Sequence, residues 1–245
     1  MIEQFQNGKK IYSDGTEVEL EMLKIAEEFS EDLAEDYIAK DSRYTVNNTF
    51  SAVRHNILNW YPFKKDSSVL EIGAGMGAII GMLCDKCKSV TAIEMSELRS
   101  DIIRARYGKR TNLEVINQNI NDWNTTERFD YVIFIGVLEY AALFSDSQNP
   151  FEEFLTSVKR LLKSDGVLLF AIENRFGLRY WCGASEDHLQ KPFVGIEGYL
   201  EPKTARTFSK VELQTMLNNV GLKENRFYYV LPDYKFPQAI YPDEY

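Results

Sequence analysis

The stretch from Val69 to Gly77 reads Val-Leu-Glu-Ile-Gly-Ala-Gly-Met-Gly, and it decides the fold class. It begins as an apolar strand, and three glycines, Gly73, Gly75 and Gly77, then follow at alternate positions before a helical apolar pattern. Glycines at the carboxyl end of a strand let the backbone approach a ligand closely, and doubly wound sheets bind their ligands there. Several nucleotide-binding loops share this pattern, so the glycines alone do not identify the ligand.

Two acidic residues narrow the choice of ligand. Glu71 stands just before the glycines, where a carboxylate would repel a pyrophosphate but attract an ammonium group. Glu94 ends the next apolar segment, where a carboxylate can accept hydrogen bonds from both ribose hydroxyls. The two acids therefore favour an adenosine ligand that lacks phosphates and carries an ammonium group, and S-adenosylmethionine (SAM) is such a ligand.

Apolar segments alternate with helical patterns along the rest of the chain, which predicts a parallel sheet with helices on both faces. The fold class is thus α/β, with a Rossmann-like, doubly wound, mostly parallel sheet. A helix is expected over 151–162, with a turn at Asp165-Gly166 before the last of these strands. The expected strands are 68–72, 89–93, 113–116, 131–135 and 166–172.

The chain divides into two predicted parts. Residues 1–66 form an N-terminal helical cover, with an amphipathic helix over 17–41 and a second over 50–60. Residues 67–245 form the ligand-binding domain, in which 174–205 show no clean period and are interpreted as a lid insertion. Ser209 and Glu212 have capping-box spacing and open another helix, which is followed by a strand over 227–231.

From residue 67 to about 231 the chain resembles the class I SAM-dependent methyltransferases. Glu71 and the glycines match the first motif of that family, and Glu94 matches the second. Asn119 stands where the family usually has an aspartate beside the adenine, and its side-chain oxygen can still accept a hydrogen bond. The resemblance implies class I methyltransferase architecture, SAM as the cofactor and the following cofactor-binding residues: Glu71, Gly73, Gly75, Gly77, Glu94, Met95, Asn119, Ile120, Gly136 and, from the N-terminal cover, Arg54.

The segments that flank these motifs are similar to a bacterial subgroup associated with surface-polysaccharide and glycan biosynthesis, sometimes fused to further domains. They are 137–140, 171–177, 186–188, 195–199 and 232–235. A small-molecule or glycan acceptor methylated on a hydroxyl is expected, while a phosphate-linked group, a small amine and a protein side chain stay open as acceptors. The resemblance also leaves open that the chain is part of a longer polypeptide.

His188 is the candidate general base for a hydroxyl acceptor, because it follows Glu186 and Asp187, either of which could orient the imidazole. The alternative is that His188 has only a structural role and keeps the insertion closed by a hydrogen bond to a carbonyl. Glu139 is the reserve catalytic candidate. The candidate substrate-binding residues are Tyr140, Tyr180 and Trp181, although the last two could instead anchor the insertion.

Composition excludes several classes of function. Twenty-eight basic against thirty-seven acidic residues give a net charge of −9, which disfavours nucleic acid as a partner. No apolar run approaches the ~20 residues of a membrane span, and the polar first residues lack a signal sequence, so a cytoplasmic protein is expected. Three cysteines do not complete a metal site, and no metal is expected. The basic run from Arg99 to Arg110 is interpreted as a solvated helix face.

Two rival functions remain open at this point. One is an NAD-dependent enzyme of similar fold, and the other is a non-catalytic SAM-binding or scaffold domain of a larger assembly. Retained SAM binding without nicotinamide binding would exclude the first, and methyl transfer to any acceptor would exclude the second.

Overall fold

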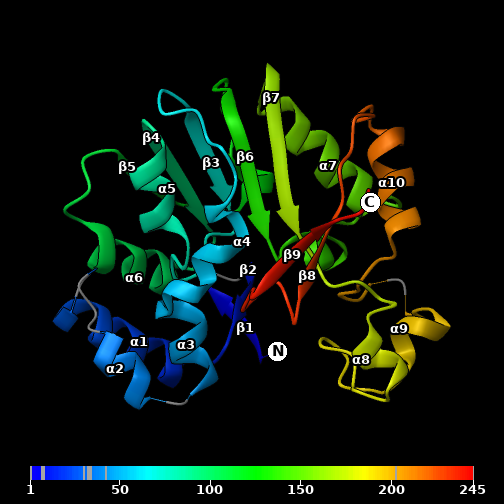
Figure 1. The fold of residues 1–245 in the computed structure, drawn as a ribbon, viewed down its shortest axis with the longest axis horizontal. Helices are drawn as coiled ribbons and strands as arrows, with labels where there is room; N and C mark the ends of the chain where they lie inside the picture. The colour runs from blue at the N-terminus through cyan, green and yellow to red at the C-terminus, as the bar shows by residue number, and fades with distance from the viewer. Residues whose placement is uncertain are drawn as a thin grey trace.

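A five-stranded parallel sheet forms the centre of the computed structural model, which describes residues 2–6, 9–29, 31, 35–41, 43–201 and 203–244 (Figure 1). The strands lie in the order β5-β4-β3-β6-β7. Their bounds are β3 (Ser68–Ile72), β4 (Ser89–Glu94), β5 (Leu113–Asn117), β6 (Phe129–Ile135) and β7 (Leu162–Ala171). The predicted fold class is confirmed.

The strand order reverses between β3 and β6. From β3 the chain proceeds outward through β4 to β5, then crosses back to pair β6 with the other side of β3. Doubly wound sheets bind ligands at such a switch point, outside the carboxyl ends of the strands. The glycine loop that follows β3 lies at this point.

Each face of the sheet is covered by helices, because successive residues of a strand point to opposite faces. On one side Tyr131 and Ile133 of β6 pack with α5 (Ile80–Lys86) and with Ile103 and Tyr107 of α6 (Glu97–Tyr107). On the other side the intervening Val132 and Phe134 pack with α7 (Pro150–Arg160) and α10 (Lys210–Asn219). Both strand faces are therefore buried, as the continuous apolar runs predicted.

The N-terminal segment differs in detail from the prediction. It begins with a hairpin of β1 (Ile2–Gln6) and β2 (Lys9–Ser13). In place of one helix over 17–41 it has two, α1 (Thr16–Phe29) and α2 (Glu35–Lys40). Residues 30 and 32–34, between these helices, lie outside the described residues. The helix expected over 50–60 is also divided, into the end of α3 (Tyr44–Phe50), the 3-10 helix η2 (Ala52–His55) and α4 (Asn56–Asn59). The break falls at Ser51, whose extended backbone and side chain cap η2.

The basic run on α6 is not a fully solvated face, so that interpretation was wrong for two of its residues. Arg99 is buried, and its guanidinium pairs with the buried Glu19 of α1 at 2.8 Å. Arg106 is also buried and donates to the carbonyls of Thr49 and Met76 at 2.9 and 2.6 Å. Partners from the N-terminal segment, Glu19 and Thr49, and from the glycine loop, Met76, make this burial favourable and hold both segments against α6.

One strand prediction needs correction. β7 begins at Leu162, and the expected turn at 163–166 is an irregularity within it, because Phe129 pairs with Leu162 but Tyr131 pairs with Val167. The strand expected over 227–231 is observed as β8 (Tyr228–Leu231), which pairs antiparallel with β9 (Ala239–Pro242) as a separate sheet. The start of β7 and the partner of β8 depend on long-range pairing, which a local pattern does not specify.

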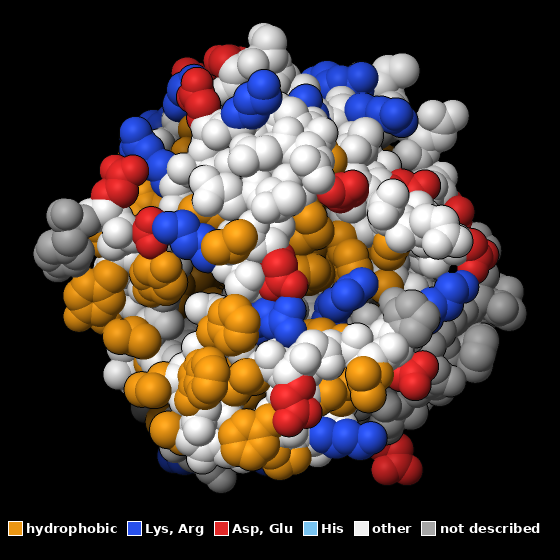
Figure 2. Space-filling model, turned by 90° about the vertical axis from the view of Figure 1, so that its right-hand side faces the viewer, with side chains coloured by type: hydrophobic (Ala, Val, Ile, Leu, Met, Phe, Trp, Pro, Cys, Tyr) orange, Lys and Arg blue, Asp and Glu red, His pale blue; other side chains and the backbone are white. Residues whose placement is uncertain are grey.

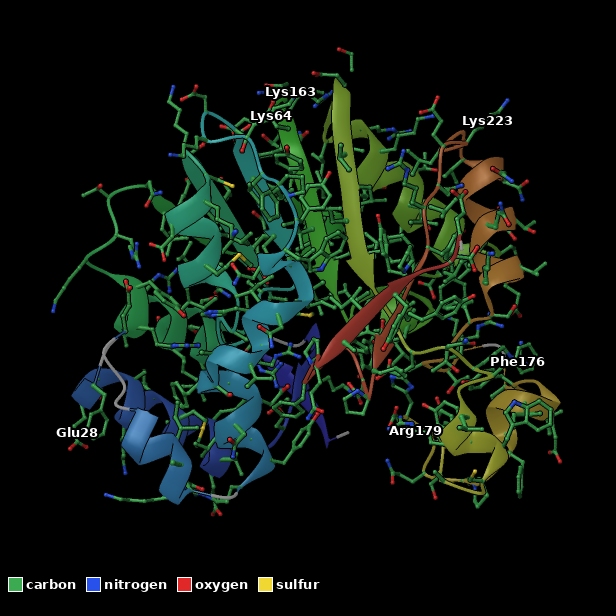
Figure 3. All side chains as sticks on the ribbon, viewed as in Figure 1. Glu28, Lys64, Lys163, Phe176, Arg179 and Lys223 are labelled. Carbon is green, nitrogen blue, oxygen red and sulfur yellow. The ribbon has the colours of Figure 1, made fainter. Side chains whose placement is uncertain are left out.

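The 174–205 insertion contains two short helices, α8 (Leu178–Trp181) and α9 (Val194–Glu197); Pro202 lies outside the described residues. Figure 3 places Phe176 and Arg179 on this insertion, and Lys64 and Lys163 at the opposite end of the sheet. Hydrophobic side chains gather on the lower part of the face seen in Figure 2. Among the helices of the described residues, none combines the length and apolar character that a membrane span requires.

Candidate active site

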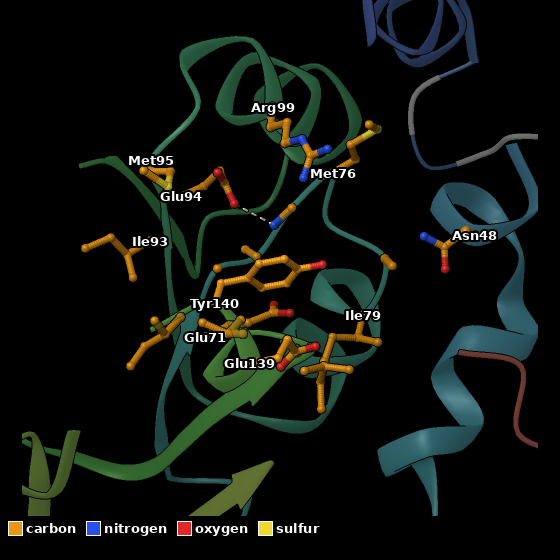
Figure 4. A pocket seen from close by; sticks show the side chains of 18 of the residues that line it. Asn48, Glu71, Met76, Ile79, Ile93, Glu94, Met95, Arg99, Glu139 and Tyr140 are labelled. Atoms are coloured by element: carbon orange, nitrogen blue, oxygen red, sulfur yellow. Dashed lines mark hydrogen bonds between the residues drawn. The ribbon is translucent and has the colours of Figure 1, made fainter. Parts of the chain in front are cut away.

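A cavity of about 500 Å³ lies at the carboxyl ends of β3, β4 and β6. In the close-up of Figure 4, Glu94 lies toward one end of the drawn side chains and Glu71 and Glu139 toward the other, with Tyr140 between them. The structure brings together at this cavity twelve of the predicted site residues: Arg54, Glu71, Gly73, Gly75, Glu94, Met95, Asn119, Ile120, Gly136, Glu139, Tyr140 and His188.

The glycine loop has the left-handed backbone that favours glycine. Gly73 and Gly75 have φ angles of +66° and +57°. A Cβ on Gly73 would lie 2.7 Å from Val137, whereas one on Gly75 would meet nothing within 4 Å and would enter open space. Gly77 instead lies against Ile103 and Tyr107 of α6. The hydroxyl of Tyr107 donates a hydrogen bond to the carbonyl of Gly77 at 3.0 Å. Gly77 therefore allows close helix packing.

Glu94 ties the end of β4 to the glycine loop. Its Oε2 accepts a hydrogen bond from the backbone N–H of Gly75 at 2.9 Å, and its Oε1 accepts one from Ser96 at 2.9 Å. Burial raises the pKa of Glu94, although Arg99 and these two hydrogen bonds oppose the rise. A carboxylate offers about four acceptor positions, so each oxygen can still accept from a further donor.

Glu71, in β3, and Arg54, in η2, are buried residues with ionisable side chains that line the same cavity. Oε2 of Glu71 and Nε of Arg54 are buried, and neither has a hydrogen-bond partner in the described part of the chain. Nη1 of Arg54 donates to the carbonyl of Lys235 at 2.8 Å. A buried acid and a buried base, each with one polar atom that lacks a partner, could hold the ammonium and the carboxylate of an amino-acid-like ligand such as the methionine part of SAM.

The titration of Glu71 gives a testable pH dependence. Burial raises its pKa from 4.5 to about 8, with Arg54 opposing the rise and Glu94 adding to it. The protonated carboxyl therefore stabilises the folded protein fully below about pH 4.5, and this stabilisation is lost as the pH rises through about 8. We expect the free energy of unfolding in urea to fall between pH 5 and 8, and Glu71→Gln to reduce the fall by a few kcal/mol. Equal pH profiles for the two proteins would contradict this assignment.

Asn119 and Ile120, in the loop after β5, also line the cavity. The side-chain oxygen of Asn119 accepts from the N–H of Asn121 at 2.9 Å and caps the 3-10 helix η3 (Ile120–Asp122). This oxygen has a second lone pair, so it can still accept from an adenine amino group, as the sequence predicts.

His188 reaches the cavity from the insertion, and its neighbour Glu186 orients it. Nδ1 of His188 lies 2.8 Å from Oε1 of Glu186, whose Oε2 also accepts from the backbone N–H of His188 at 2.8 Å. Hydrogen bonds from His188 and Leu189 lower the pKa of Glu186, against the opposing effect of burial. Glu186 therefore stays ionised, and Nε2 is the ring nitrogen left to take a proton. Asp187, the other candidate partner, instead accepts from Tyr180 at 2.8 Å.

The three candidate substrate-binding aromatics have different positions. Tyr140 lines the cavity, and its ring meets that of His188 edge to face at a centroid distance of 5.2 Å. Tyr180 is buried within the insertion, where its hydroxyl binds Arg179 and Asp187. Trp181 is 58% exposed and stacks on Phe176. The structure thus brings Tyr140 to the cavity but not Tyr180 or Trp181.

Among the charged or polar residues that line the cavity, sequence reasoning did not place Arg99, Glu173, Tyr234 and Lys235 in the site. Nζ of Lys235 donates to Oε1 of Glu173 at 2.7 Å. Glu173 lies in the segment 171–177, and Tyr234 and Lys235 lie in the segment 232–235. Both segments carry the subgroup resemblance, but the sequence alone does not show that they line one cavity.

Comparisons with known proteins agree with this geometry. A family model described as a methyltransferase domain matches residues 70–170. Nodulation protein S of Bradyrhizobium diazoefficiens is 31% identical over 74 residues, which are 30% of this chain and 35% of that protein. (S)-coclaurine N-methyltransferase of Papaver somniferum is 25% identical over 156 residues, which are 62% of this chain and 42% of that enzyme. The chain thus matches less than half the length of either relative.

A solved structure described as the DhpI-SAM-HEP complex has the same fold, with a TM-score of 0.53 and 18% identity over 95% of this chain and 98% of that one. The parallel sheet and the cavity at its switch point have the arrangement of a Rossmann-like fold, and residues 70–170 of this fold are similar to a methyltransferase domain. This similarity agrees with the resemblance that the glycine loop and Glu94 carry.

Proposed function

We propose that this protein transfers the methyl group of SAM to a small-molecule acceptor that enters between the loop after β6 and the 174–205 insertion. The observation that carries the proposal is that one cavity brings two chemically different sets of residues together. We call the glycine loop, Glu71 and Glu94 the cofactor end and Glu139, Tyr140 and His188 the acceptor end; the two sets meet where Glu71 and Glu139 lie in Figure 4. SAM supplies an already activated methyl group, so the chain needs to position two partners and accept a proton.

The cofactor end would bind SAM through side chains whose hydrogen-bonding capacity the described chain uses only in part. Glu71 would accept from the ammonium group, Arg54 would pair with the carboxylate, and Glu94 would accept from the ribose hydroxyls. Met95, Asn119 and Ile120 would contact the adenine, and Gly136 would border the methionine part. The division into a cover of residues 1–66, a domain of residues 67–245 and a lid at about 174–205 belongs to the same proposal.

Glu94→Gln tests the ribose contact. We expect it to weaken SAM binding by about 2 kcal/mol, or about thirtyfold, because two charge-assisted hydrogen bonds become neutral ones. Glutamine can still accept from one backbone N–H, so the loop should keep its fold. Calorimetry with SAM measures the effect, with the exposed Glu224→Gln as the matched control. Unchanged affinity would mean that Glu94 does not hold the ribose.

The acceptor end would accept a proton through His188, which Glu186 holds in place. A hydroxyl acceptor needs such a base, as the sequence predicted, and Glu139 is the reserve candidate. The buried carboxyl groups here and the name of the Papaver relative, an N-methyltransferase, favour a nitrogen acceptor as a second candidate. A role in bacterial surface-carbohydrate biosynthesis in the cytoplasm, on a glycan acceptor, remains part of the proposal and rests on the subgroup resemblance.

The direct test is incubation with isotopically labelled SAM and pools of candidate acceptors, followed by mass spectrometry of the labelled products. Transfer to a small molecule supports the proposal. Binding of SAM without transfer to any pool would favour the non-catalytic SAM-binding domain instead. Binding of a nicotinamide dinucleotide in place of SAM would favour the NAD-dependent enzyme.

A further inference from the structure

Two buried glutamates at the acceptor end, Glu139 and Glu173, lack a full set of partners. Glu139 is 1% exposed and Glu173 is 8% exposed. One carboxylate oxygen of each lies within 4.8 Å of the other and of a ring nitrogen of His188. Oε2 of each glutamate is buried and accepts no hydrogen bond from the residues that the structure describes. Because buried carboxylate oxygens are rarely left without a donor, this pair indicates a ligand that brings one.

When both carboxyl groups of this pair are ionised, the described chain pairs a cationic side chain with only one of them. Lys235 donates to Oε1 of Glu173 at 2.7 Å and neutralises one of the two carboxylates. Burial, and after it the charge of Glu173, raises the pKa of Glu139 well above its usual range. The surroundings therefore favour the neutral form of Glu139, which would ionise beside a further positive charge. A cation with N–H donors would supply both that charge and the hydrogen bond that Oε2 lacks.

An organic ammonium group fits this place better than a divalent metal ion. With Lys235 present, a monovalent cation brings the two carboxylates to a net charge of zero, whereas a divalent ion would leave an excess positive charge in a cavity that also receives a sulfonium. The aromatic ring of Tyr140 lies beside His188 at the same end, and aromatic faces attract ammonium groups. Both the charge balance and the neighbouring ring of Tyr140 therefore favour an organic ammonium group over a divalent metal ion.

We propose that Glu139 and Glu173 bind the protonated amine of the acceptor, and that this amine nitrogen is the atom that is methylated. The inference rests on the proposed methyltransferase function and names its substrate class, a small molecule with a primary or secondary amine. Glu139 and Glu173 touch the acceptor, while Lys235 acts through Glu173 as a positioning residue.

The reaction balances with groups that line the cavity. The bound ammonium gives one proton to Nε2 of His188, whose Nδ1 is held by Glu186. The freed lone pair forms the bond from nitrogen to the methyl carbon as the bond from that carbon to sulfur breaks, and sulfur keeps the electron pair. The methylated nitrogen is again positively charged and stays beside Glu139, and the proton on His188 passes to solvent when the product leaves.

Matched probe pairs test the inference on the whole chain. Binding is measured by calorimetry in the presence of S-adenosylhomocysteine for n-butylamine against n-butanol and for glucosamine against glucose. We expect the amine of at least one pair to bind at least tenfold more tightly than its hydroxyl partner. Glu139→Gln should remove at least tenfold of that affinity, and Glu173→Gln provides a second variant if the first does not fold. The exposed Glu224→Gln is the control.

The outcomes separate this inference from the function on which it rests. Equal binding of the two members of every pair, no amine binding at 10 mM (about 3 kcal/mol of binding free energy), or amine binding unchanged in both glutamine variants would overturn the ammonium site. Stoichiometric binding of Mn²⁺ that Glu139→Gln abolishes would replace it with a metal site. Failure of the unaltered protein to bind SAM would instead overturn the proposed function.

Discussion

Gly75→Val is expected to weaken SAM binding by at least about a hundredfold, or about 2.7 kcal/mol, while the protein still folds. Gly75 has a φ of +57°, and its N–H donates to Glu94. A Cβ at this position meets no atom within 4 Å because it enters the cavity, so the valine side chain would occupy ligand space. Backbone strain of about 1–2 kcal/mol would also disturb the bond to Glu94.

The control for Gly75→Val is Gly183→Val, because Gly183 has a similar left-handed φ of +88° but lies in the 174–205 insertion. Both variants should lose similar stability in a thermal melt, and only Gly75→Val should lose SAM binding in calorimetry. If the two variants bind SAM equally well, the glycine loop does not hold the cofactor.

His188→Ala is expected to lower turnover by 10²- to 10⁴-fold and to leave SAM affinity within about twofold of the unaltered protein. The imidazole lies at the acceptor end and contacts Glu186 and Tyr140, whereas Glu71, Glu94 and the glycine loop form the cofactor end. Single-turnover rates with labelled SAM, measured beside calorimetric affinities, separate the two effects.

Glu186→Gln is the companion variant for His188→Ala. It keeps the shape of the side chain and an acceptor for the backbone N–H groups, but it removes the charge that orients the imidazole. We expect an intermediate loss of turnover. If both variants turn over normally, His188 only holds the insertion shut and another group, such as Glu139, accepts the proton.

Much of the fold could be predicted because its signals are local. The apolar runs of β3, β4, β5 and β6 were located within two residues of their observed ends, and the helices between them follow from periodicity. Local sequence patterns did not predict the features that depend on contacts with a distant segment of the chain. β8 pairs with β9 and not with the central sheet, and Arg106 is buried because the carbonyls of Thr49 and Met76 accept its hydrogen bonds.

The cofactor end of the site could also be predicted, because Glu71, Gly73, Gly75 and Glu94 stand at the ends of two adjacent strands and their spacing follows from the parallel sheet. The acceptor end could be predicted only in part. His188 was identified by residue type, but Glu186 as its partner, rather than Asp187, depends on how the insertion folds.

The sequence alone was enough to predict the α/β class and a candidate ligand site built from the glycine loop, Glu71 and Glu94, which line the cavity at the switch point, because alternation, glycine spacing and strand-end acids act over a few neighbouring positions. Only the tertiary structure decided that Glu139, Glu173, His188 and Lys235 share one cavity. They come from the loop after β6, the end of β7, the insertion and the loop between β8 and β9. Their burial and mutual charges, which set the chemistry of the acceptor end, exist only once these four segments have packed together.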